Sequence, residues 1–547
     1  MNANCDNKKP IFKSLGFQLE PSGNGVYRIE TIKKYCDILS VLGYDTLYLD
    51  ISGAFEIKDE PYFCYMRGRY TCEELREIDS YATEKGLRVI PIIQTLAHLQ
   101  FLFQWKEYQP IRDMDDILLV GEERTYTLIE NMIKTMASCF SSNIIHLGMD
   151  EAHNLGKGRY RDKNGDIDKI TILKEHFGRV FEIAKRYGYK CQIWGDMLCT
   201  LAYGGFDGDF LFDKFDKSQD VSKIIPQDVD VVYWDYYGRK KAHYTRFIQQ
   251  FKKLSKNLIF AGGACNWLGF CPHNSFSIEV TRKAFEACRE EGIENVFITT
   301  WQDNGADASI FSILPTVVAA AEFARGNFDL TKIKERFKEV VGADFDDFLA
   351  LEEVDKIKTL DTNPERYLLT PTKYLLYNDP FIGYWDSTIN ECDREVFRSS
   401  ADRLGKAANN KQWGYLFQSI EALARVMEIK YDLGVKTRKA YQAGDKKELL
   451  ELTQKAYPEL IKRLKKFYRF YEKRWTIENK TTGFDVQDIR LGGLIQRVEH
   501  CRNLLQQYLA GKIEKIDDLE LEVLDFKNGK WATTYNYYRE SVTVNKL

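Results

Sequence analysis

Residues 143–153 read NIIHLGMDEAH, and this stretch decides how the rest of the sequence is interpreted. An apolar run that carries one polar residue, His146, ends in two adjacent carboxylates, Asp150 and Glu151. The run predicts a buried β-strand, and Gly148 lets a backbone or a ligand come close just before the acids. Two neighbouring carboxylates at the end of a buried strand are typical of an acid–base site. A solvated loop after a strand is the alternative interpretation.

Short apolar runs alternate with amphipathic helical segments over the first three hundred residues. The eight runs are Gly16–Glu20, Asp45–Ile51, Arg88–Gln94, Asn143–Glu151, Lys190–Met197, Val229–Tyr236, Asn257–Cys265 and Asn295–Asp303. The helical segments include Ile29–Leu42, Cys72–Lys85, Thr125–Ser138, Lys174–Tyr187, Ile278–Glu291 and Pro315–Arg325. Eight strands, each followed by a helix, predict an α/β fold with a closed (β/α)8 barrel, the TIM barrel.

The composition changes after about Gly326 to long stretches that are rich in Lys and Glu. Three of them have helical apolar spacing and few strand signals: Trp413–Tyr431, Lys446–Trp475 and Leu491–Leu509. We therefore predict a catalytic barrel over residues 1–328 and an α-helical C-terminal domain over residues 329–547. The polar segment Glu478–Asp485 is interpreted as a loop that joins two helices.

Composition and charge exclude several classes of function for these 547 residues. The formal net charge is only -3, so no overall field attracts nucleic acid or an anionic membrane. The 12 cysteines are irregularly spaced without a Cys-x-x-Cys pair, which argues against a zinc site and against a disulfide framework. Cysteines without either pattern favour a reducing compartment. Because no stretch resembles a signal peptide or a membrane span, we expect a cytoplasmic protein.

Polar and aromatic side chains recur at the carboxyl ends of the predicted strands, where barrels of this class build their active sites. They are Glu20 after the first strand, His98 after the third, Trp194 and Asp196 at the fifth, Trp234 and Tyr236 at the sixth, Trp267 after the seventh, and Trp301 and Asp303 at the eighth. A single Trp is usually a core residue. Four strand ends that carry Trp predict a pocket walled by rings with carboxylates inside.

The segment HLGMDE, residues 146–151, resembles the His-x-Gly-Gly-Asp-Glu signature of glycoside hydrolase family 20, the exo-acting β-N-acetylhexosaminidases. The segment PIIQTLAHL, residues 91–99, places His98 where that family has a His after the third strand. Trp194, Trp234 and Trp301 fall on strand ends where the family's pocket has tryptophans. The sequence is most similar to the intracellular hexosaminidase D-like branch and to related bacterial enzymes.

The resemblance implies removal of terminal non-reducing β-linked GlcNAc or GalNAc by substrate-assisted retaining hydrolysis. It implies that Glu151 is the acid and base, that Asp150 orients the acetamido N–H, and that Tyr236 holds the acetamido oxygen. The other substrate-binding residues that we predict are Glu20, His98, His146, Trp194, Trp234, Trp267, Trp301 and Asp303. We expect no cofactor and no metal, and the partner is a glycan or glycoconjugate with a terminal N-acetylhexosamine. We expect neither nucleic acid nor a membrane as partner, and a homodimer stays open.

The sequence departs from the family pattern at two places. Met149 stands where the signature has its second Gly, and Gly23 stands where many members have a sugar-binding Arg, so that contact is left to Glu20, Arg69 or Asp303.

Three alternatives to the family's chemistry stay open. They are a non-catalytic carbohydrate-binding barrel, a two-carboxylate retaining glycosidase, and a metal hydrolase that uses His98, His146, Asp150 and Asp196. The metal alternative is disfavoured because Gly16–Glu20 lacks a His-x-His pair. The choice between GlcNAc and GalNAc is also left open.

Overall fold

The computed structural model describes residues 11–203, 224–357, 370–389 and 393–525. Its first half is a closed barrel of eight parallel strands in sequential order, which confirms the predicted fold class. The strands are β1 Ser14–Leu19, β2 Thr46–Asp50, β3 Arg88–Ile92, β4 Ile144–His146, β5 Lys190–Trp194, β6 Asp230–Trp234, β7 Leu258–Gly263 and β8 Asn295–Thr299. The barrel closes because β1 pairs with both β2 and β8.

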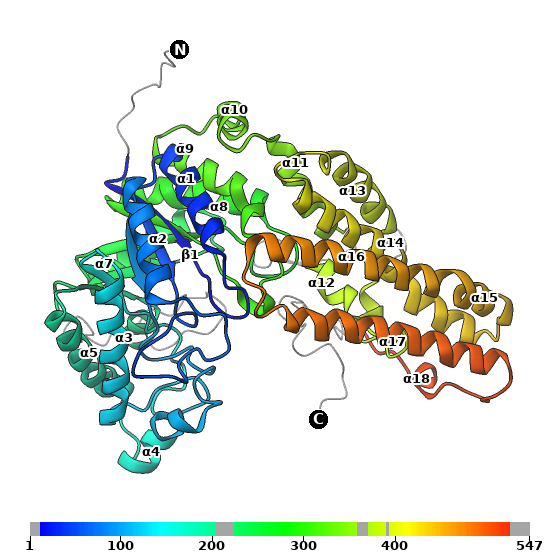
Figure 1. Ribbon diagram of the computed structural model, residues 1–547, viewed down its shortest axis with the longest axis horizontal. Helices are drawn as coiled ribbons and strands as arrows, with labels where there is room; N and C mark the ends of the chain where they lie inside the picture. The colour runs from blue at the N-terminus through cyan, green and yellow to red at the C-terminus, as the bar shows by residue number, and fades with distance from the viewer. Residues whose placement is uncertain (1–10, 204–223, 358–369, 390–392, 526–547) are drawn as a thin grey trace. The chain divides into compact units, whose positions relative to one another are not determined.

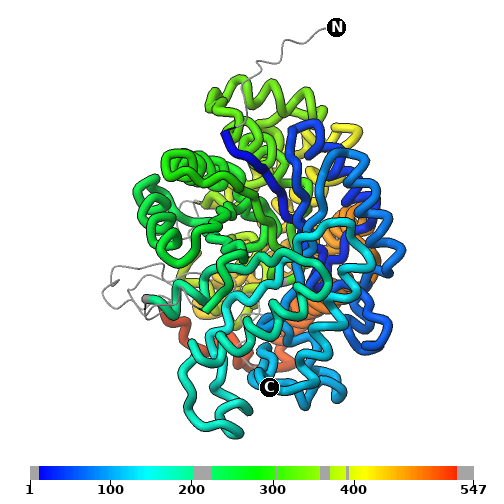
Figure 2. Tube along the Cα trace, turned by 90° about the vertical axis from the view of Figure 1, so that its left-hand side faces the viewer, coloured from blue at the N-terminus to red at the C-terminus, as the bar shows by residue number. Residues whose placement is uncertain are grey.

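Helices form the outer layer around these strands (Figures 1 and 2). They are α1 Ile29–Leu42, α2 Cys72–Glu84, α3 Glu123–Cys139, α4 Arg159–Asn164, α5 Lys169–Arg186, α6 Asp196–Tyr203, α7 Lys241–Leu254, α8 Asn274–Glu290 and α9 Leu314–Ala324. The short helix α4 was not predicted, and α6 and α7 are the helices expected after the fifth and sixth strands. Several strands are shorter than predicted at their carboxyl ends: β4 stops at His146, and Asp196 is the first residue of α6. Asp150 and Glu151 therefore lie in a loop rather than in a strand, and Asp196 begins a helix.

The barrel interior is filled with apolar side chains, as in other barrels of eight strands. Tyr48 and Phe297 stack in it with ring centroids 4.1 Å apart, and Trp194 packs in the same cluster. Gly16 on β1 leaves room for these rings, since a Cβ there would lie 2.8 Å from the Tyr48 ring. This solid core means that a ligand can be bound only at an end of the barrel.

The chain divides into two compact units. The first comprises Met1–Ala264, Ser277–Trp301 and Val317–Ile333, and the second comprises Cys265–Phe276, Gln302–Thr316 and Lys334–Leu547. Two short segments that follow β7 and β8 are thus members of the second unit. The predicted boundaries, 1–328 and 329–547, stay a prediction.

The second unit is helical, as the sequence predicted. It takes in most of α10 Leu330–Val341, whose first four residues belong to the first unit. Its other helices are α11 Phe345–Leu349, α12 Pro371–Leu376, α13 Arg394–Ala407, α14 Gly414–Gln442, α15 Lys446–Glu451, α16 Tyr457–Glu478, α17 Asp485–Leu509 and α18 Asp517–Glu520. A π-helical turn, Leu452–Ala456, interrupts the predicted stretch between α15 and α16. The polar segment after Glu478 joins α16 to α17, which confirms its predicted joining role.

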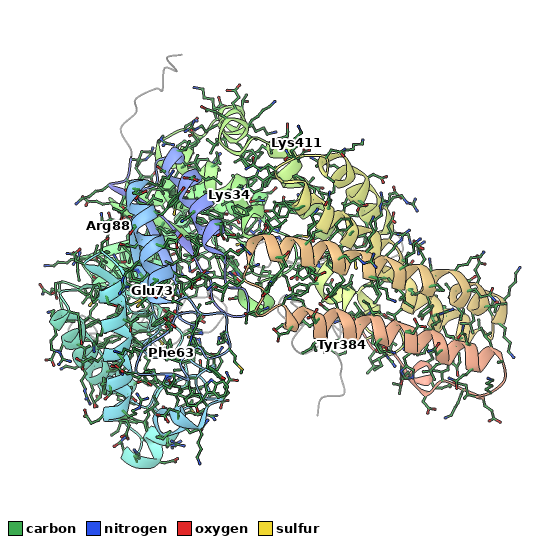
Figure 3. The ribbon with its side chains drawn as sticks, in the orientation of Figure 1. Lys34, Phe63, Glu73, Arg88, Tyr384 and Lys411 are labelled. Atoms are coloured by element: carbon green, nitrogen blue, oxygen red, sulfur yellow. The ribbon has the colours of Figure 1, made fainter. Side chains whose placement is uncertain are left out.

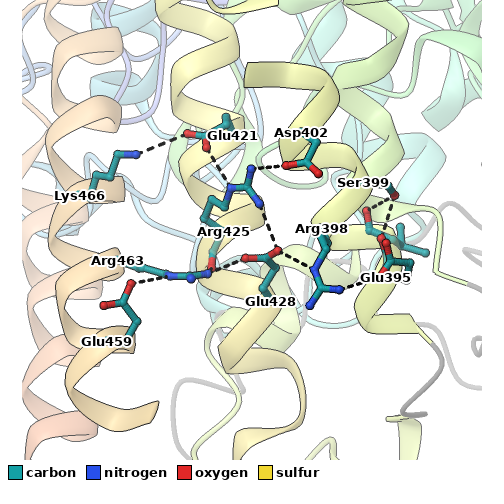
Figure 4. Close-up of polar contacts among 11 residues, drawn as sticks. Glu395, Arg398, Ser399, Asp402, Glu421, Arg425, Glu428, Glu459, Arg463 and Lys466 are labelled. Carbon is teal, nitrogen blue, oxygen red and sulfur yellow. Dashed lines mark hydrogen bonds and ion pairs between the residues drawn. The ribbon is translucent and has the colours of Figure 1, made fainter. Parts of the chain in front are cut away.

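Charged side chains connect three helices of the second unit, α13, α14 and α16 (Figure 4). Arg425 on α14 contacts Asp402 of α13 at 2.5 Å and Glu428 at 3.2 Å. Arg463 on α16 contacts the same Glu428 at 2.7 Å and Glu459 at 3.0 Å. Single exposed ion pairs contribute little to stability, but several charges that form a network are an exception.

Candidate active site

The backbone between β4 and the two acids adopts an unusual conformation. Gly148, Met149 and Glu151 have φ values of 69°, 74° and 50°, in the left-handed region. A Cβ on Gly148 would lie 2.2 Å from Gln94 Oε1 and 2.9 Å from the Ile93 carbonyl oxygen, so only glycine fits. Met149, the departure from the signature, is buried in a conformation that costs a side-chain-bearing residue about 1–2 kcal/mol. Strain of this kind is often concentrated at functional sites.

Asp150 is held by two side chains from the loop after β3. Gln94 Nε2 donates a hydrogen bond of 2.8 Å to Asp150 Oδ1, and His98 Nε2 lies 3.2 Å from Asp150 Oδ2. Gln94 Oε1 in turn accepts a hydrogen bond from the Met149 N–H at 3.3 Å. Burial by itself raises the pKa of Asp150, but the charge of His98 and the hydrogen bonds outweigh it, and the net pKa is lowered. Asp150 is therefore an anion with a fixed orientation.

His98 is the cation between the two acids. Its Nε2 also lies 3.4 Å from Glu151 Oε2, and its own φ is 57°. Burial lowers the pKa of His98, yet the opposing charges of Asp150 and Glu151 prevail and hold that pKa well above its usual value. His98, one of the predicted substrate-binding residues, is thus brought to the acid pair, where it carries a proton.

Glu151 is the more exposed acid, with 38% of its side chain accessible against 15% for Asp150. Its backbone N–H donates to Asp196 Oδ2 at 2.8 Å, and Trp234 Nε1 donates to Asp196 Oδ1 at 3.3 Å. Burial, followed by the charge of Asp150, raises the pKa of Asp196 to about 7. Asp196 therefore couples the position of Glu151 to that of Trp234, and it holds its own proton more tightly than an exposed Asp.

Aromatic rings from three strand ends lie near these acids. Trp194 is buried, with its ring centroid 5.8 Å from that of Trp301, and Trp234 stacks on Tyr236 at 5.2 Å. Burial raises the pKa of Tyr236 well above its usual value, and its electrostatic interactions include both Asp150 and Glu151. The structure therefore brings the predicted Trp194, Trp234, Trp301 and Tyr236 together beside the acid pair.

His146 has a supporting position. Its ring is fully buried, 4.4 Å from the Trp194 ring centroid, and its Nδ1 accepts a hydrogen bond of 3.1 Å from the Gly148 N–H. Burial lowers the pKa of His146 to about 3, so the ring is neutral. This geometry indicates that His146 orients the left-handed turn at Gly148 and Met149. Contact of His146 with substrate stays a prediction.

Comparison with protein families assigns both halves of the chain. Residues 25–257 match the catalytic domain of glycosyl hydrolase family 20, and residues 346–536 match the glycoside hydrolase 20C C-terminal domain. The chain belongs to glycoside hydrolase family 20. It is therefore a glycoside hydrolase, and the matched catalytic region contains the Asp150–Glu151 pair.

Relatives of this family 20 chain are distant. Hexosaminidase D of Homo sapiens is 20% identical over 431 residues, which cover 72% of this chain and 85% of the human protein. The β-hexosaminidase of Porphyromonas gingivalis is 24% identical over 35% of this chain, and the match covers only 29% of that protein. Among solved structures, an exo β-N-acetylglucosaminidase of this family from Vibrio harveyi has 14% identity and a TM-score of 0.47, with coverage of 63% of this chain and 59% of the other.

Three further predicted substrate-binding residues of this family 20 chain are Glu20, Trp267 and Asp303. Glu20 follows β1 and accepts a hydrogen bond of 2.6 Å from Ser22 Oγ. Trp267 is buried and Asp303 is exposed, and both belong to the second unit. Their roles stay predictions. Arg69, considered as a substitute for the missing Arg, donates to the carbonyl oxygens of Pro61 and Phe63 in its own loop.

Sequence reasoning missed four residues that shape the family 20 site. Gln94 anchors Asp150, and Asp50 at the end of β2 has a pKa raised to about 7, chiefly by burial. Asp235 accepts hydrogen bonds from Tyr233, Tyr237 and Gly238, which fixes the loop that carries Tyr236. Arg67 donates to the carbonyl of Gly23, the position of the absent Arg. Asp50, Gln94 and Asp235 all stand at strand ends, and that position is the signal that could have identified them.

The donor atoms of His98, Asp150 and Glu151 lie within 4.8 Å of one another, a spacing that suits a metal ion. A histidine ligand must be neutral, however, and these two acids hold a proton on His98. Binding of a metal ion here would have to compete with that proton.

Proposed function

We propose that this protein is an exo-acting β-N-acetylhexosaminidase that removes terminal non-reducing β-linked GlcNAc or GalNAc from a glycan with retention of configuration. The observation that carries this proposal is the unequal environment of two adjacent carboxylates. Asp150 is ionised, mostly buried and held in one orientation, whereas the Glu151 side chain is more accessible to solvent and less constrained. Such a pair supplies one fixed anion and one group that is free to exchange a proton.

The arrangement does not suit an inverting enzyme, and it makes Asp150 a poor nucleophile. An inverting enzyme needs its carboxyl groups about 6.5–9.5 Å apart, and here oxygens of the two acids lie within 4.8 Å, closer to the spacing of about 5 Å in a two-carboxylate retaining enzyme. In such an enzyme Asp150 would be the nucleophile, but Gln94 and His98 engage both of its oxygens. Both acids also approach the same atom, His98 Nε2. The other acids near the pair, Asp50 and Asp196, hold their protons up to about pH 7, which makes them poor nucleophiles. The nucleophile is then best supplied by the 2-acetamido group of the sugar.

In the first step, the acetamido oxygen attacks the anomeric carbon while the bond from that carbon to the leaving oxygen breaks. Glu151 gives its proton to the leaving oxygen, and a bicyclic oxazolinium intermediate forms. Asp150 accepts a hydrogen bond from the acetamido N–H and stabilises the positive charge that develops there. The lowered pKa of Asp150 keeps it ionised for this task.

In the second step, Glu151 removes a proton from water, and the resulting oxygen attacks the anomeric carbon. The acetamido group is released unchanged, and the two inversions give net retention. His98 keeps the two acids in register, because its positive charge offsets their repulsion once Glu151 has given up its proton. Tyr236 holds the acetamido oxygen, and Trp194, Trp234 and Trp301 enclose the acetamido methyl group and one face of the sugar.

The test compares release of nitrophenol from the aryl β-N-acetylglucosaminide and from the aryl β-glucoside. These substrates differ mainly in the acetamido group. Rapid hydrolysis of the first with almost none of the second supports the proposal, and comparable rates refute substrate assistance. Binding of N-acetylglucosamine by calorimetry without hydrolysis of any aryl glycoside would instead support a carbohydrate-binding barrel, which the absent Arg at Gly23 motivates.

A cytoplasmic location is a further part of the proposal, and the choice between a monomer and a homodimer stays open. The described cysteines are free thiols, and nearly all of them are buried, which suits a reducing compartment. No helix in the described part of the chain is long and apolar enough to cross a membrane. Fractionation of cells and light scattering of the purified protein test these two points.

A further inference from the structure

Three aromatic side chains, Tyr62, Tyr65 and Trp105, form a cluster on the surface of the first unit. We call them the aromatic cluster. Tyr62 is 44% exposed and Tyr65 37% exposed, and Trp105 is half-buried. Large exposed apolar groups that gather in one place usually mark a binding surface, whereas single ones need no explanation.

The three rings contact one another closely. The centroid of Trp105 lies 5.7 Å from that of Tyr62 and 5.3 Å from that of Tyr65, and the two tyrosines are 5.9 Å apart. The Tyr65 ring meets both of its neighbours edge to face, at interplanar angles of 69° and 77°. Edge-to-face packing leaves some ring faces uncovered, in agreement with the exposure of both tyrosines.

A buried layer fixes this cluster from below. Phe63 (Figure 3) lies between Tyr62 and Tyr65 in sequence and is fully buried. Its ring centroid lies 4.8 Å from that of Phe55 and 5.9 Å from that of Phe101. Arg69 donates to the carbonyl oxygens on both sides of Tyr62, those of Pro61 and Phe63. Arg67 lies over the Phe101 ring at 5.0 Å. The rings are therefore presented by a packed loop, so little ordering entropy is lost when they bind a ligand.

The chain connects the aromatic cluster to the candidate active site. Trp105 lies in the same loop as His98. Two successive turns fold this loop back on itself: the Leu102 N–H donates to Leu99 O at 2.9 Å, and the Trp105 N–H donates to Leu102 O at 3.0 Å. Each turn spans less than about 7 Å between Cα atoms, so His98 and Trp105 are at most roughly 18 Å apart. Tyr62 and Tyr65 lie in the loop that begins after Asp50, which interacts electrostatically with Asp150.

We propose that the aromatic cluster binds the part of the glycan that leaves, with its rings stacked on sugars beyond the cleaved bond. This inference rests on the proposed function, since it assigns a second binding region to the same site. Exposed tyrosine ring faces with phenolic hydroxyls at their edges match a pyranose, which has apolar faces and polar edges. The cluster therefore selects oligosaccharides over substrates that carry a single sugar.

The kinetic test uses a β-linked trimer of N-acetylglucosamine and the monosaccharide N-acetylglucosamine as a competitive inhibitor. For Trp105→Ala, we expect KM for the trimer to rise by about tenfold, because a well-placed ring contact is worth roughly one such factor. The monosaccharide contacts only the acid pair and its pocket. Its inhibition constant for Trp105→Ala should therefore stay within about twofold of the value for the unmodified protein. Trp105→Phe keeps a ring and should restore most of the affinity.

Tyr384→Ala is the matched control, because Tyr384 is 39% exposed but lies in the second unit (Figure 3). It should change neither constant. An unchanged KM for the trimer in Trp105→Ala and Tyr62→Ala would overturn the inference. An equal loss of monosaccharide binding would overturn it too, because the damage would then be general.

A binding measurement separates this inference from the proposed function. In a Glu151→Gln background, calorimetry with the trimer should show tighter binding than with the monosaccharide, and Trp105→Ala should remove the difference. That result supports the aromatic cluster even if the unmodified protein hydrolyses nothing. Equal affinity for trimer and monosaccharide refutes the cluster even if hydrolysis of aryl substrates proceeds as proposed.

Discussion

Replacement of Gly148 by alanine tests whether the turn before the acids is built around Gln94. A Cβ at this position would lie 2.2 Å from Gln94 Oε1, so the Gln94 side chain has to move. Its movement breaks the hydrogen bond to the ionised Asp150, worth about 1.5–3 kcal/mol, and the one from the Met149 N–H, worth about 0.5–1.5 kcal/mol. The left-handed φ adds about 1–2 kcal/mol. We therefore expect a total loss of about 3–6 kcal/mol.

Gly188→Ala is the matched control for this change. Gly188 has a φ of 80°, close to the 69° of Gly148, but an added Cβ there meets no atom within 4 Å. It should therefore lose only the backbone term of about 1–2 kcal/mol. The difference between the two variants reports the displacement of Gln94 together with the close approach to the Ile93 carbonyl oxygen.

Urea unfolding gives both stabilities, and turnover of the aryl β-N-acetylglucosaminide gives the effect on chemistry. We expect kcat to fall by about tenfold to hundredfold in Gly148→Ala, because Asp150 loses one of its two anchors. Gly188→Ala should keep its kcat. Equal stability losses in the two variants, with an unchanged kcat in Gly148→Ala, would refute the argument that Gln94 positions Asp150.

Three further predictions concern the acids. Glu151→Gln should lose nearly all turnover of substrates with poor leaving groups and less with good ones, and an equal effect across a leaving-group series would exclude Glu151 as the acid. His98→Asn should move the acidic limb of the kcat/KM profile to higher pH, since the charge that lowers the pKa of Asp150 is removed; an unmoved limb would contradict this coupling. Asp196 has a pKa of about 7 in the folded protein, against about 4 in the unfolded chain. Its contribution to stability is therefore complete below about pH 4 and is lost as the pH rises through about 7. The fall in Tm from about pH 5 to about pH 8 should therefore be smaller in Asp196→Asn, and an equal fall would show that Asp196 is not responsible.

Local sequence pattern was sufficient for the architecture, because alternating apolar runs and amphipathic helices specify strands and helices within short windows. The same pattern placed Asp150 and Glu151 at a strand end, where barrels present functional groups. It was poor at the exact ends of strands: β4 stops four residues before Asp150, since the left-handed turn at Gly148 and Met149 follows no periodicity.

By itself, the sequence determined the eight-stranded fold, the acid pair and the aromatic residues at the strand ends, because each of these depends on neighbours in the chain. Tertiary structure decided which groups surround Asp150. Gln94 and His98 are more than fifty residues away in sequence and reach it because β3 and β4 are adjacent, with Ile92 paired to His146. Only that packing sets burial and nearby charge, and these two quantities make Asp150 an anion, His98 a cation and Asp196 a tight holder of its proton.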